Sequence, residues 1–363
     1  MGQNATARVN YVPVDSTEVN GVQSEFITLL QKLAPDLSEE MAKRALILER
    51  IEAMQPVGRR QLAQHLNLPE REIRSTASLL KELGYIELTS SGMTIHEKAR
   101  EILESARDFS RAISGLNEME NRISELLDIE RVVIVPGDAD KDPLVLEDVG
   151  RAASVRLKNA LQNGDTLAVT GGTTIAAVAR HLSGSNNPLN IMVVPARGGL
   201  GRSVETQANT LASEIAAKIG AHHRLIHLPD RLDNAAMQEM MKLPDVREAM
   251  ELLERADIIL HGIGNAETTM KNRKLPRNIQ NELSVKNAVG ESFGSYFDMS
   301  GQCLLKSSSI GIDIAKLSPK CRMIAVAAGG RKAEAIISIM RHYHHTVLVT
   351  DEGAAEKIIT LLQ

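Results

Sequence analysis

Aromatic residues and cysteines are scarce in this chain of 363 residues. Four Phe, four Tyr and no Trp amount to 2% of the sequence. That is too few rings for a surface that stacks single-stranded nucleic acid or for an aromatic ligand cage. The two cysteines, Cys303 and Cys321, stand in no CxxC or Cys/His arrangement with zinc spacing. We therefore expect a reduced, cytoplasmic protein without a structural metal or a disulfide framework.

Long apolar runs are absent as well. The run 323–328 is among the longest and falls far short of the roughly 18 residues that a membrane span needs. Hydrophobic residues at 43% and charged residues at 24% are ordinary for a globular protein. The length favours two domains and a connector. Residues 1–32 include a polar start without an apolar stretch, which indicates a flexible N-terminal arm.

Positive charge is concentrated near the N-terminus, although the net charge of the chain is −4. Between residues 41 and 81, eight basic residues stand against four acidic ones, which is a surplus of four positive charges. The rest of the chain therefore carries −8. A basic N-terminal segment followed by an acidic remainder indicates a nucleic-acid-binding domain joined to a domain with a different function.

The pattern of residues 33–96 predicts a winged helix-turn-helix domain. Ser38 is expected to cap the first helix, which Pro56 ends. Apolar residues at helical spacing, a tight turn at 67–69 and a terminating Gly84 define the elements that follow. The expected elements after the first helix are helices at 59–65 and 70–83 and short strands at 85–88 and 93–95.

The last helix of such a domain enters the major groove of double-stranded DNA with its N-terminal residues. Guanidinium groups suit both guanine edges and phosphates. The alternative is a solvated basic face on a small helical bundle that binds a protein. We favour DNA because turn, hairpin and charge agree. The predicted DNA-binding residues are Arg59 and Arg60 for phosphates, and Arg71, Arg74, Ser75 and Ser78 for the groove.

Residues 97–128 predict a helical linker with one apolar seam. Its apolar residues recur at intervals of three and four, as in a coiled coil. One interpretation is a seam between two protomers, which would give a homodimer that matches a two-fold operator. The other is a helix that packs on its own domain. The seam comprises Ile102, Ala106, Phe109, Ile113, Leu116, Met119, Ile123 and Leu126.

Residues 129–363 predict an α/β domain with a parallel, Rossmann-like sheet. Short β-branched runs alternate with amphipathic stretches, which is the rhythm of βαβ units. Ligands of such sheets bind at the carboxyl ends of the strands. The expected strands are 132–135, 167–170, 191–194, 224–228, 258–260, 323–327 and 347–350.

Three of these strand ends combine glycine with hydroxyl or cationic residues. The segment 170–174 reads Thr-Gly-Gly-Thr-Thr, 197–199 reads Arg-Gly-Gly, and 329–332 reads Gly-Gly-Arg-Lys. The first loop alone fits a structural turn as well as a phosphate cradle. It matches neither a Walker loop nor GxGxxG, so no cofactor is expected. Three such ends in one sheet favour an anionic sugar phosphate, particularly a bisphosphate.

Several strings in the sequence together resemble the SorC (DeoR-like) family of bacterial transcription regulators, and within it the repressors of central glycolytic genes. The similarity runs from about residue 33 to 361. The resemblance implies an effector domain of the sugar-phosphate isomerase and glucosamine-phosphate deaminase type. It also implies repression of a glycolytic operon with fructose 1,6-bisphosphate as inducer. The strings are QPVGRR (55–60), AVTGGTTI (168–175), VPARGGLG (194–201), HGIG (261–264) and HTVLVTDEGAA (345–355).

The resemblance also implies roles for individual residues of an effector site. One phosphate would be held at the first loop and the other by the third, with contacts to the sugar between them. Where close relatives have a double arginine after HGIG, this chain has Asn272-Arg273-Lys274, and Arg273 would serve there. The implied residues are Gly171, Gly172, Thr173 and Thr174 for one phosphate, Arg197, Gly198, Gly199, Gln207 and Arg273 for phosphate or sugar, Glu291 for sugar hydroxyls, and Lys332 for the other phosphate.

A sugar-phosphate isomerase or deaminase-like enzyme is the alternative function, since such enzymes use a carboxylate and often a histidine beside a phosphate loop. Its candidates would be Glu291, His261 and Asp298. His261 fits a core histidine better, and Asp298 fits a turn. The group 342–345 contains three histidines, which fit a solvated helix end better than a metal site. We favour a regulator over an enzyme, with a protein-binding scaffold third.

The expected partners follow from this interpretation. They are double-stranded operator DNA, a phosphorylated sugar, and further copies of the chain in a homodimer, with a tetramer on DNA as a second candidate assembly. No membrane is expected among them.

Overall fold

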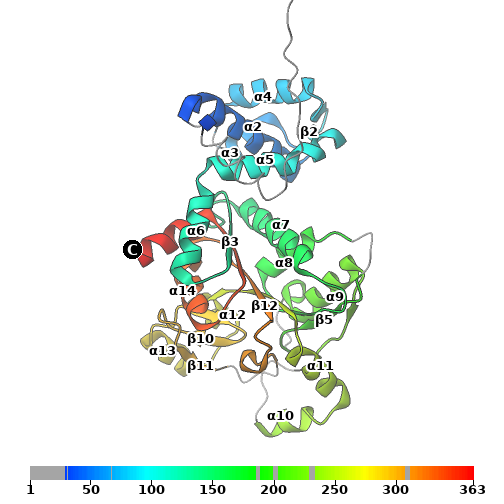
Figure 1. Ribbon diagram of the computed structural model, residues 1–363, viewed down its shortest axis with the longest axis vertical. Helices are drawn as coiled ribbons and strands as arrows, with labels where there is room; N and C mark the ends of the chain where they lie inside the picture. The colour runs from blue at the N-terminus through cyan, green and yellow to red at the C-terminus, as the bar shows by residue number, and fades with distance from the viewer. Residues whose placement is uncertain are drawn as a thin grey trace, which may run out of the picture. The chain divides into compact units, whose positions relative to one another are not determined.

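The computed structural model describes residues 29–30, 32–66, 68–184, 189–198, 203–228, 234–306 and 311–363. The chain divides into two units, the first ending at Gly115 and the second beginning at Leu116. Most of the expected arm at 1–32, and Gly199 of the expected effector site, lie outside the described residues. Figure 1 labels the elements of both units.

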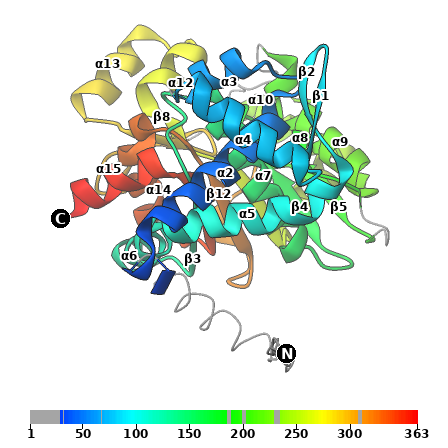
Figure 2. The same ribbon diagram turned by 90° about the horizontal axis from the view of Figure 1, so that it is seen from above.

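The first unit combines a helical cluster with a two-stranded hairpin, as the sequence predicts. The hairpin is antiparallel and pairs Ile86 with Ile95. Figure 2 shows it beside the helices of the unit. The positive φ of Gly84 (75°) marks the end of the third helix. The elements are α2 (Pro35–Met54), α3 (Arg59–Leu66), α4 (Glu70–Glu82), β1 (Ile86–Thr89), β2 (Gly92–Ile95), η1 (Glu97–Ala99) and α5 (Arg100–Ile113).

The start of α2 differs from the prediction. The helix begins at Pro35, with Ala34 at the capping position, so the prediction of a cap by Ser38 is wrong. Ser38 is buried in the first turn, and its hydroxyl donates to the carbonyl of Pro35 at 2.9 Å. Proline at the first helical position needs no N–H partner and begins the helix earlier than the serine would.

Residues 97–128 form two helices instead of one. Helix α5 ends at Ile113, Gly115 takes a positive φ of 70°, and α6 (Leu116–Leu127) begins directly after it. Leu103 of α5 is buried in the core of the first unit, whereas Ile123 of α6 is buried in the second unit. The predicted seam is therefore not carried by one continuous helix: Ile102 packs against the core of the first unit, Leu116 and Ile123 are buried in that of the second, and Leu126 is 40% exposed. The division after Gly115 falls within the linker expected at 97–128.

The second unit contains a seven-stranded parallel sheet, which confirms the predicted α/β class. The strand order is β3-β13-β12-β7-β4-β5-β6. All six neighbouring pairs are parallel. The strands are β3 (Arg131–Val135), β4 (Thr166–Val169), β5 (Met192–Pro195), β6 (His222–His223), β7 (Ile258–Gly262), β12 (Arg322–Val326) and β13 (Val347–Asp351).

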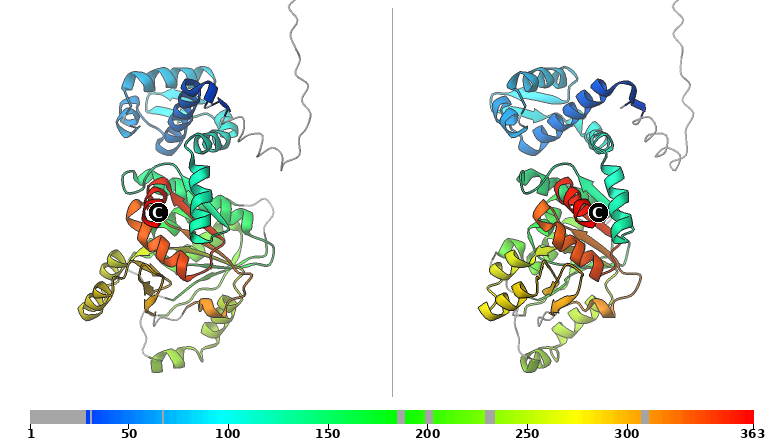
Figure 3. Two further views of the ribbon diagram at one scale, coloured as in Figure 1. Left: turned by 60° about the vertical axis from the view of Figure 1, so that its left-hand side comes forward. Right: turned by 90° about the vertical axis from the view of Figure 1, so that its left-hand side faces the viewer.

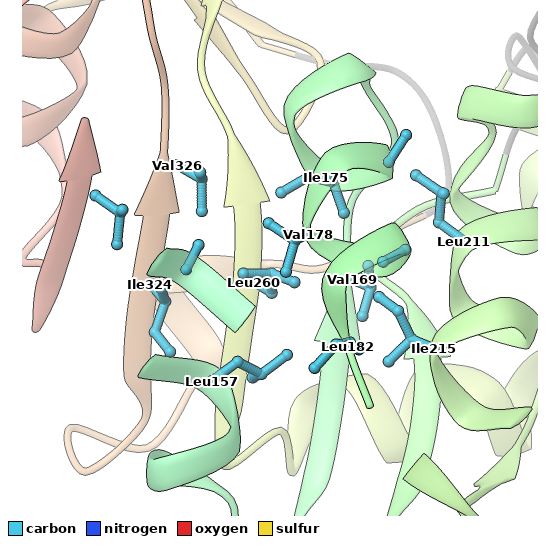
Figure 4. Packing of buried hydrophobic residues seen from close by; sticks show 14 of the residues in the cluster. Leu157, Val169, Ile175, Val178, Leu182, Leu211, Ile215, Leu260, Ile324 and Val326 are labelled. Carbon is cyan, nitrogen blue, oxygen red and sulfur yellow. The ribbon is translucent and has the colours of Figure 1, made fainter. Parts of the chain in front are cut away.

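Helices cover both faces of this sheet, because its strands carry apolar residues on both sides. On one face α7, α8 and α9 pack against Val169, Leu260 and Val326, as Figure 4 shows. On the other face α6, α14 and α15 cover one half and α11 the other. Figure 3 shows α6 beside α15. The remaining helices are α7 (Pro143–Ala160), α8 (Thr173–His181), α9 (Ala208–Ile219), α10 (Asn234–Met240), α11 (Pro244–Glu254), α12 (Ala266–Asn272), α13 (Arg277–Val285), α14 (Ala333–His342) and α15 (Glu352–Leu362), with short 3₁₀ turns η2 (Val204–Thr206), η3 (Ile314–Lys316) and η4 (Gly330–Lys332).

The segment 224–228 is not a strand, contrary to the prediction. The strand that pairs with β5 is the two-residue β6, which precedes it. The side-chain amide of Asn209 donates to the carbonyl of Ile226 at 2.8 Å and accepts from its N–H at 3.1 Å. Ile226 is still buried, together with Leu228. Burial therefore explains the apolar pattern, while a side chain supplies the backbone partners that a neighbouring strand would have supplied.

A second, antiparallel sheet follows β7 and was not predicted from the sequence. Its order is β11-β10-β9-β8, with β8 (Gly264–Asn265), β9 (Gly290–Ser292), β10 (Ser295–Phe297) and β11 (Cys303–Leu305). Strand β8 starts two residues after β7 ends. The small sheet therefore grows from the carboxyl edge of the large one and brings β9 to that edge.

Candidate functional site

The loop between β4 and α8 leaves room only for glycine at one position. A Cβ on Gly171 would lie 2.5 Å from the carbonyl oxygen of Thr206, and Gly172 has φ +122°. The Gly172 N–H donates to that same carbonyl at 2.9 Å. Helix α8 then begins at Thr173, and the first amides of a helix have no partners within it. The N-terminus of α8 is therefore suited to an anion.

This loop lies where the direction of the sheet reverses. From β4 the chain continues to β5 on one side, whereas from β7 it continues to β12 on the other. The carboxyl ends of β4 and β7 are in contact, since the Gly262 N–H donates to the Thr170 hydroxyl at 3.1 Å. A Cβ on Gly262 would lie 3.8 Å from the Thr174 hydroxyl. Such a switch point is the usual place for a ligand in an open parallel sheet.

Gln207 adjoins the same loop. It precedes α9, and its carbonyl carbon would lie 3.5 Å from a Cβ on Gly171. The structure thus brings Gly171, Gly172, Thr174 and Gln207 together, as the sequence predicts. Thr173 is exposed at the helix start, and Thr174 is buried.

Glu291 and Arg273 form an ion pair beside this loop. Gly264 of β8 pairs with Glu291 of β9, and a Cβ on Gly264 would lie 2.8 Å from Glu291 Oε2. Glu291 Oε1 accepts from the Gly294 N–H at 2.7 Å and lies 3.1 Å from Arg273 Nη2. The Glu291 side chain is 9% exposed and that of Arg273 is 34% exposed. The prediction from sequence placed both residues in the site but missed their pairing.

Lys332 stands at the end of η4, directly after β12. Burial lowers the pKa of Lys332, while the negative charges of Asp351, Asp140 and Glu291 raise it. Glu291 therefore acts electrostatically on Lys332 as well as on Arg273. Arg273 pairs directly with the buried Glu291 carboxylate, whose negative charge also acts on Lys332.

Arg197 lies at a neighbouring cavity instead of at the α8 loop. It forms an isolated β-bridge with Gly311 and lines a cavity of about 430 Å³ together with Lys306, Phe293 and other residues. Phe293 belongs to the hairpin that carries Glu291, which links this cavity to the site. The described lining does not include Thr173, Thr174 or Lys332. A Cβ on Gly198 would meet Ile226 at 3.0 Å, so Gly198 allows close packing.

The enzyme candidates are engaged in structural contacts. His261 is fully buried; its Nε2 lies 2.9 Å from His345 Nε2, its Nδ1 lies 3.2 Å from the Ser292 hydroxyl, and burial keeps its pKa well below the usual value. Asp298 accepts the N–H groups of Ser300 and Gln302 and so closes a turn. His342 and His344 are exposed, as expected for a helix end, but His345 is 1% exposed and burial lowers its pKa to about 4, so a solvated position for it is wrong.

The predicted DNA-binding residues belong to α3 and α4 of the first unit. All six predicted DNA-binding residues are exposed, and Ser78 donates its hydroxyl to the carbonyl of Arg74. Glu70 pairs with two of them: its Oε1 lies 3.0 Å from Arg74 Nη2, and its Oε2 lies 3.4 Å from Arg60 Nε. The sequence argument missed this pairing, although Glu70 and Arg74 stand four residues apart on one helix.

Two absences hold for the described part of the chain. None of its helices is long and apolar enough to cross a membrane. Its histidine, cysteine and acidic side chains form no group of three or more that could hold a metal ion.

Comparisons with known proteins match both units. A family profile described as a sugar-binding domain matches residues 111–360, and one described as the CggR N-terminal DNA binding domain matches residues 41–109. The chain is 39% identical to the central glycolytic genes regulator of Priestia megaterium over 334 residues, covering 92% of this chain and 98% of the relative. It is 37% identical to the protein of that name from Bacillus subtilis, covering 93% and 99%. A solved SorC family transcriptional regulator from Enterococcus faecalis superposes with a TM-score of 0.63 at 34% identity, covering 67% of this chain and 99% of that one.

Proposed function

Because the chain belongs to the SorC/DeoR family of transcription regulators, we propose that it represses a glycolytic operon and leaves the operator when a phosphorylated sugar binds. Its relatives are named as regulators, not enzymes, so its task is to bind. Fructose 1,6-bisphosphate is the inducer in this proposal. The proposal places the protein in the bacterial cytoplasm, where operator DNA is found.

The observation that carries the proposal is the anion-binding geometry at the switch point. The free amides at the start of α8 and the hydroxyls of Thr173 and Thr174 receive one phosphate. Lys332 receives the other. Glu291 lies between cations and accepts sugar hydroxyls, which a carboxylate does well as a pure acceptor.

The remaining predicted residues complete the contacts. Gln207, beside Gly171, offers an amide to phosphate or sugar. Arg273 approaches the ligand from the Glu291 side, and Arg197 from the neighbouring cavity. A doubly phosphorylated sugar fits this distribution better than a singly phosphorylated one, because donors stand at separate ends of the site.

The first unit reads DNA as a winged helix-turn-helix. Helices α3 and α4 form the helix-turn-helix, and the β1–β2 hairpin is the wing. Arg71, Arg74, Ser75 and Ser78 all lie exposed on α4, and its N-terminal end enters the major groove. Arg59 and Arg60 contact phosphates from α3.

The working form in this proposal is a homodimer on a palindromic or direct-repeat operator, with pairing into tetramers on DNA. Two readers on one operator require two copies of the chain. Sugar binding changes the arrangement of the two DNA-binding units. It shifts the equilibrium between the operator-bound and the released arrangement only by the difference between its affinities for these two states.

The test measures thermal shift and operator release with a panel of sugars and sugar phosphates. We expect fructose 1,6-bisphosphate to raise the melting temperature and to release a fluorescent operator duplex, with fructose 6-phosphate and glucose 6-phosphate weaker and unphosphorylated fructose inactive. Chemical turnover of any sugar phosphate would favour an enzyme. Stabilisation by the panel without operator release would contradict the inducer role.

Operator affinity provides the second measurement. We expect the logarithm of the association constant to fall linearly and steeply with the logarithm of salt concentration, because phosphate contacts release counterions. A flat dependence would contradict the assignment of the first unit to DNA.

A further inference from the structure

Asp351 joins three strand-end segments of the second unit. It is the last residue of β13 and is fully buried. Its Oδ1 and Oδ2 accept the Gly329 N–H at 2.9 and 2.8 Å, its Oδ2 accepts the Ala139 N–H at 2.7 Å, and its Oδ1 accepts the Ala354 N–H at 3.2 Å. One carboxylate thus holds the loops after β3 and β12 and the first turn of α15.

The three segments fit together without spare room. A Cβ on Gly353 would lie 2.4 Å from Asp138 Cγ, and one on Gly329 would lie 2.8 Å from Asp140 Oδ1. Asp140 also accepts both the backbone N–H and the Nε–H of Arg331 at 2.8 Å. The position of the segment after β12 is therefore fixed from two sides.

Lys332 depends directly on this arrangement. Its backbone N–H donates to the carbonyl of Gly329 at 2.9 Å, which closes η4. The N–H of that same Gly329 is the group that donates to both oxygens of Asp351. The carboxylate thus controls the turn from which the lysine side chain starts.

We propose that Asp351 is a positioning residue of the effector site: it fixes the turn that carries Lys332, and its negative charge favours the protonated lysine. It does not contact the sugar phosphate, because backbone N–H groups occupy both of its oxygens. This inference rests on the proposed function, in which Lys332 binds a phosphate. No role of this kind follows from the relatives' names.

The charges around Lys332 set the expected effect of removing Asp351. The groups that act on the ammonium are Asp351 at the end of β13, Asp140 after β3, and Glu291 on β9, and each raises the pKa that burial lowers. Without the Asp351 charge the pKa of Lys332 falls further. Because an anion is bound by the ammonium, binding is then lost at a lower pH as the pH rises.

The variant Asp351→Asn keeps the size of the side chain but has one carbonyl oxygen, and its NH₂ group would face N–H donors. Asp165→Asn is the matched control. Asp165 is also buried and accepts a backbone N–H, from Gln162, and a cation, Arg322 Nη2, each at 2.9 Å. It stands at the start of β4, the opposite edge of the sheet.

The first measurement is the apparent Kd for fructose 1,6-bisphosphate across a pH series, using the full chain. We expect Asp351→Asn to weaken binding near neutral pH by about tenfold, the scale of one charged hydrogen bond, and to move the alkaline loss of binding to lower pH. Asp165→Asn is expected to bind like the parent protein. Equal losses in both variants would overturn the inference.

Arginine at the lysine position provides a rescue. The double variant Asp351→Asn, Lys332→Arg carries a guanidinium that stays charged over the whole pH range. We expect its binding to be independent of alkaline pH, unlike that of Asp351→Asn alone. A double variant that keeps the shifted alkaline loss would contradict the charge part of the inference.

A ligand-free measurement separates this inference from the proposed function. NMR of labelled lysine side chains, with the Lys332 signal assigned through Lys332→Arg, follows its titration directly. We expect Lys332 to titrate at lower pH in Asp351→Asn than in the parent protein and in Asp165→Asn. An unchanged titration overturns the inference, whereas a parent protein that binds no phosphorylated sugar overturns only the proposed function.

Discussion

At the scale of single residues, the site depends on few cations held among carboxylates. Lys332 is half-buried, and the negative charges of Asp351, Asp140 and Glu291 act on its ammonium group, while Arg273 is paired with Glu291. In the proposed function, this half-buried cation accepts a phosphate through charge-assisted hydrogen bonds. Loss of such a residue should therefore affect the ligand much more than the fold.

Lys332→Ala should abolish release of the operator by fructose 1,6-bisphosphate and leave operator affinity within about twofold, because Lys332 lies in the second unit and a charged phosphate contact carries much of the affinity. The fluorescence anisotropy of a labelled operator, with and without the sugar, measures both the operator affinity and its release. Lys357→Ala is the control, since Lys357 is exposed on α15. An unchanged sugar response in Lys332→Ala would remove this residue from the site.

Gly172→Ala should weaken sugar binding, whereas Gly164→Ala should not. Both glycines have positive φ, 122° and 92°, and a Cβ on either would meet nothing within 4 Å. Each substitution should therefore lower the free energy of unfolding by a similar amount, about 1–2 kcal/mol. Only Gly172 sets the direction of the amides at the start of α8. Chemical unfolding and calorimetric titration separate the two effects, and equal affinities would contradict the phosphate position at α8.

The sequence predicted that several strand-end residues would lie at one edge of the sheet, but not the contacts they make. Glycine-rich strand ends predicted where Gly171, Gly172 and Lys332 would gather, since ends of parallel strands share one edge. The Arg273–Glu291 pair could not be predicted, because the two residues meet only through β8 and β9. Asp351 was missed, although an acidic residue at the end of a strand at this edge was a signal that could have marked it.

At the scale of elements, α4 carries the residues proposed to bind DNA together with an acidic residue at its start. Glu70 stabilises the positive N-terminal end of the helix and holds Arg60 and Arg74. The Arg74 hydrogen bond is the main cause of the lowered pKa of Glu70. Exposed pairs of this kind are weak, so DNA phosphates can displace the carboxylate.

Glu70→Gln should strengthen DNA binding at low salt by about two- to fivefold, because it frees two guanidinium groups whose exposed pairs are worth only about 0.2–1 kcal/mol each. The gain should shrink as salt is added. Glu82→Gln, an exposed position at the far end of α4, is the control. Affinity for operator and for unrelated duplex should rise together, and a loss of affinity in Glu70→Gln would show that Glu70 orients the arginines for binding.

A strand could be predicted from the sequence where it is buried on both faces and is long enough to show a continuous run of apolar residues. β-Branched runs such as those of β3, β12 and β13 identify central parallel strands. The segment 224–228 has such a pattern, but the Asn209 side chain satisfies its Ile226 backbone. Strands of the small sheet have only two or three residues, as in Gly290–Ser292, which is too short for a periodic signal.

At the scale of the whole molecule, two separate cores divide the work. The core of the first unit contains Leu103 of α5, and that of the second contains Leu116 and Ile123 of α6. The predicted site residues for sugar lie in the second unit and those for DNA in the first. The proposed sugar-binding and DNA-binding functions therefore belong to two separate units, each with its own hydrophobic core.

A chain comprising residues 116–363 should fold alone and bind fructose 1,6-bisphosphate with an affinity within about threefold of the full protein, because its core and its site are self-contained. Thermal shift and calorimetry of both chains measure this. Unphosphorylated fructose serves as the control ligand. A shortened chain that folds but no longer binds would mean that the first unit contributes to the site.

In the proposed function, the Arg273 guanidinium already has a counterion, the Glu291 carboxylate at 3.1 Å. An incoming phosphate that engages Arg273 competes with a carboxylate already in place, so its affinity reflects an exchange of partners. Ligands with one weak negative charge gain little from that exchange, and dianions gain most. If the proposed site is correct, this pairing disfavours neutral sugars relative to dianionic sugar phosphates.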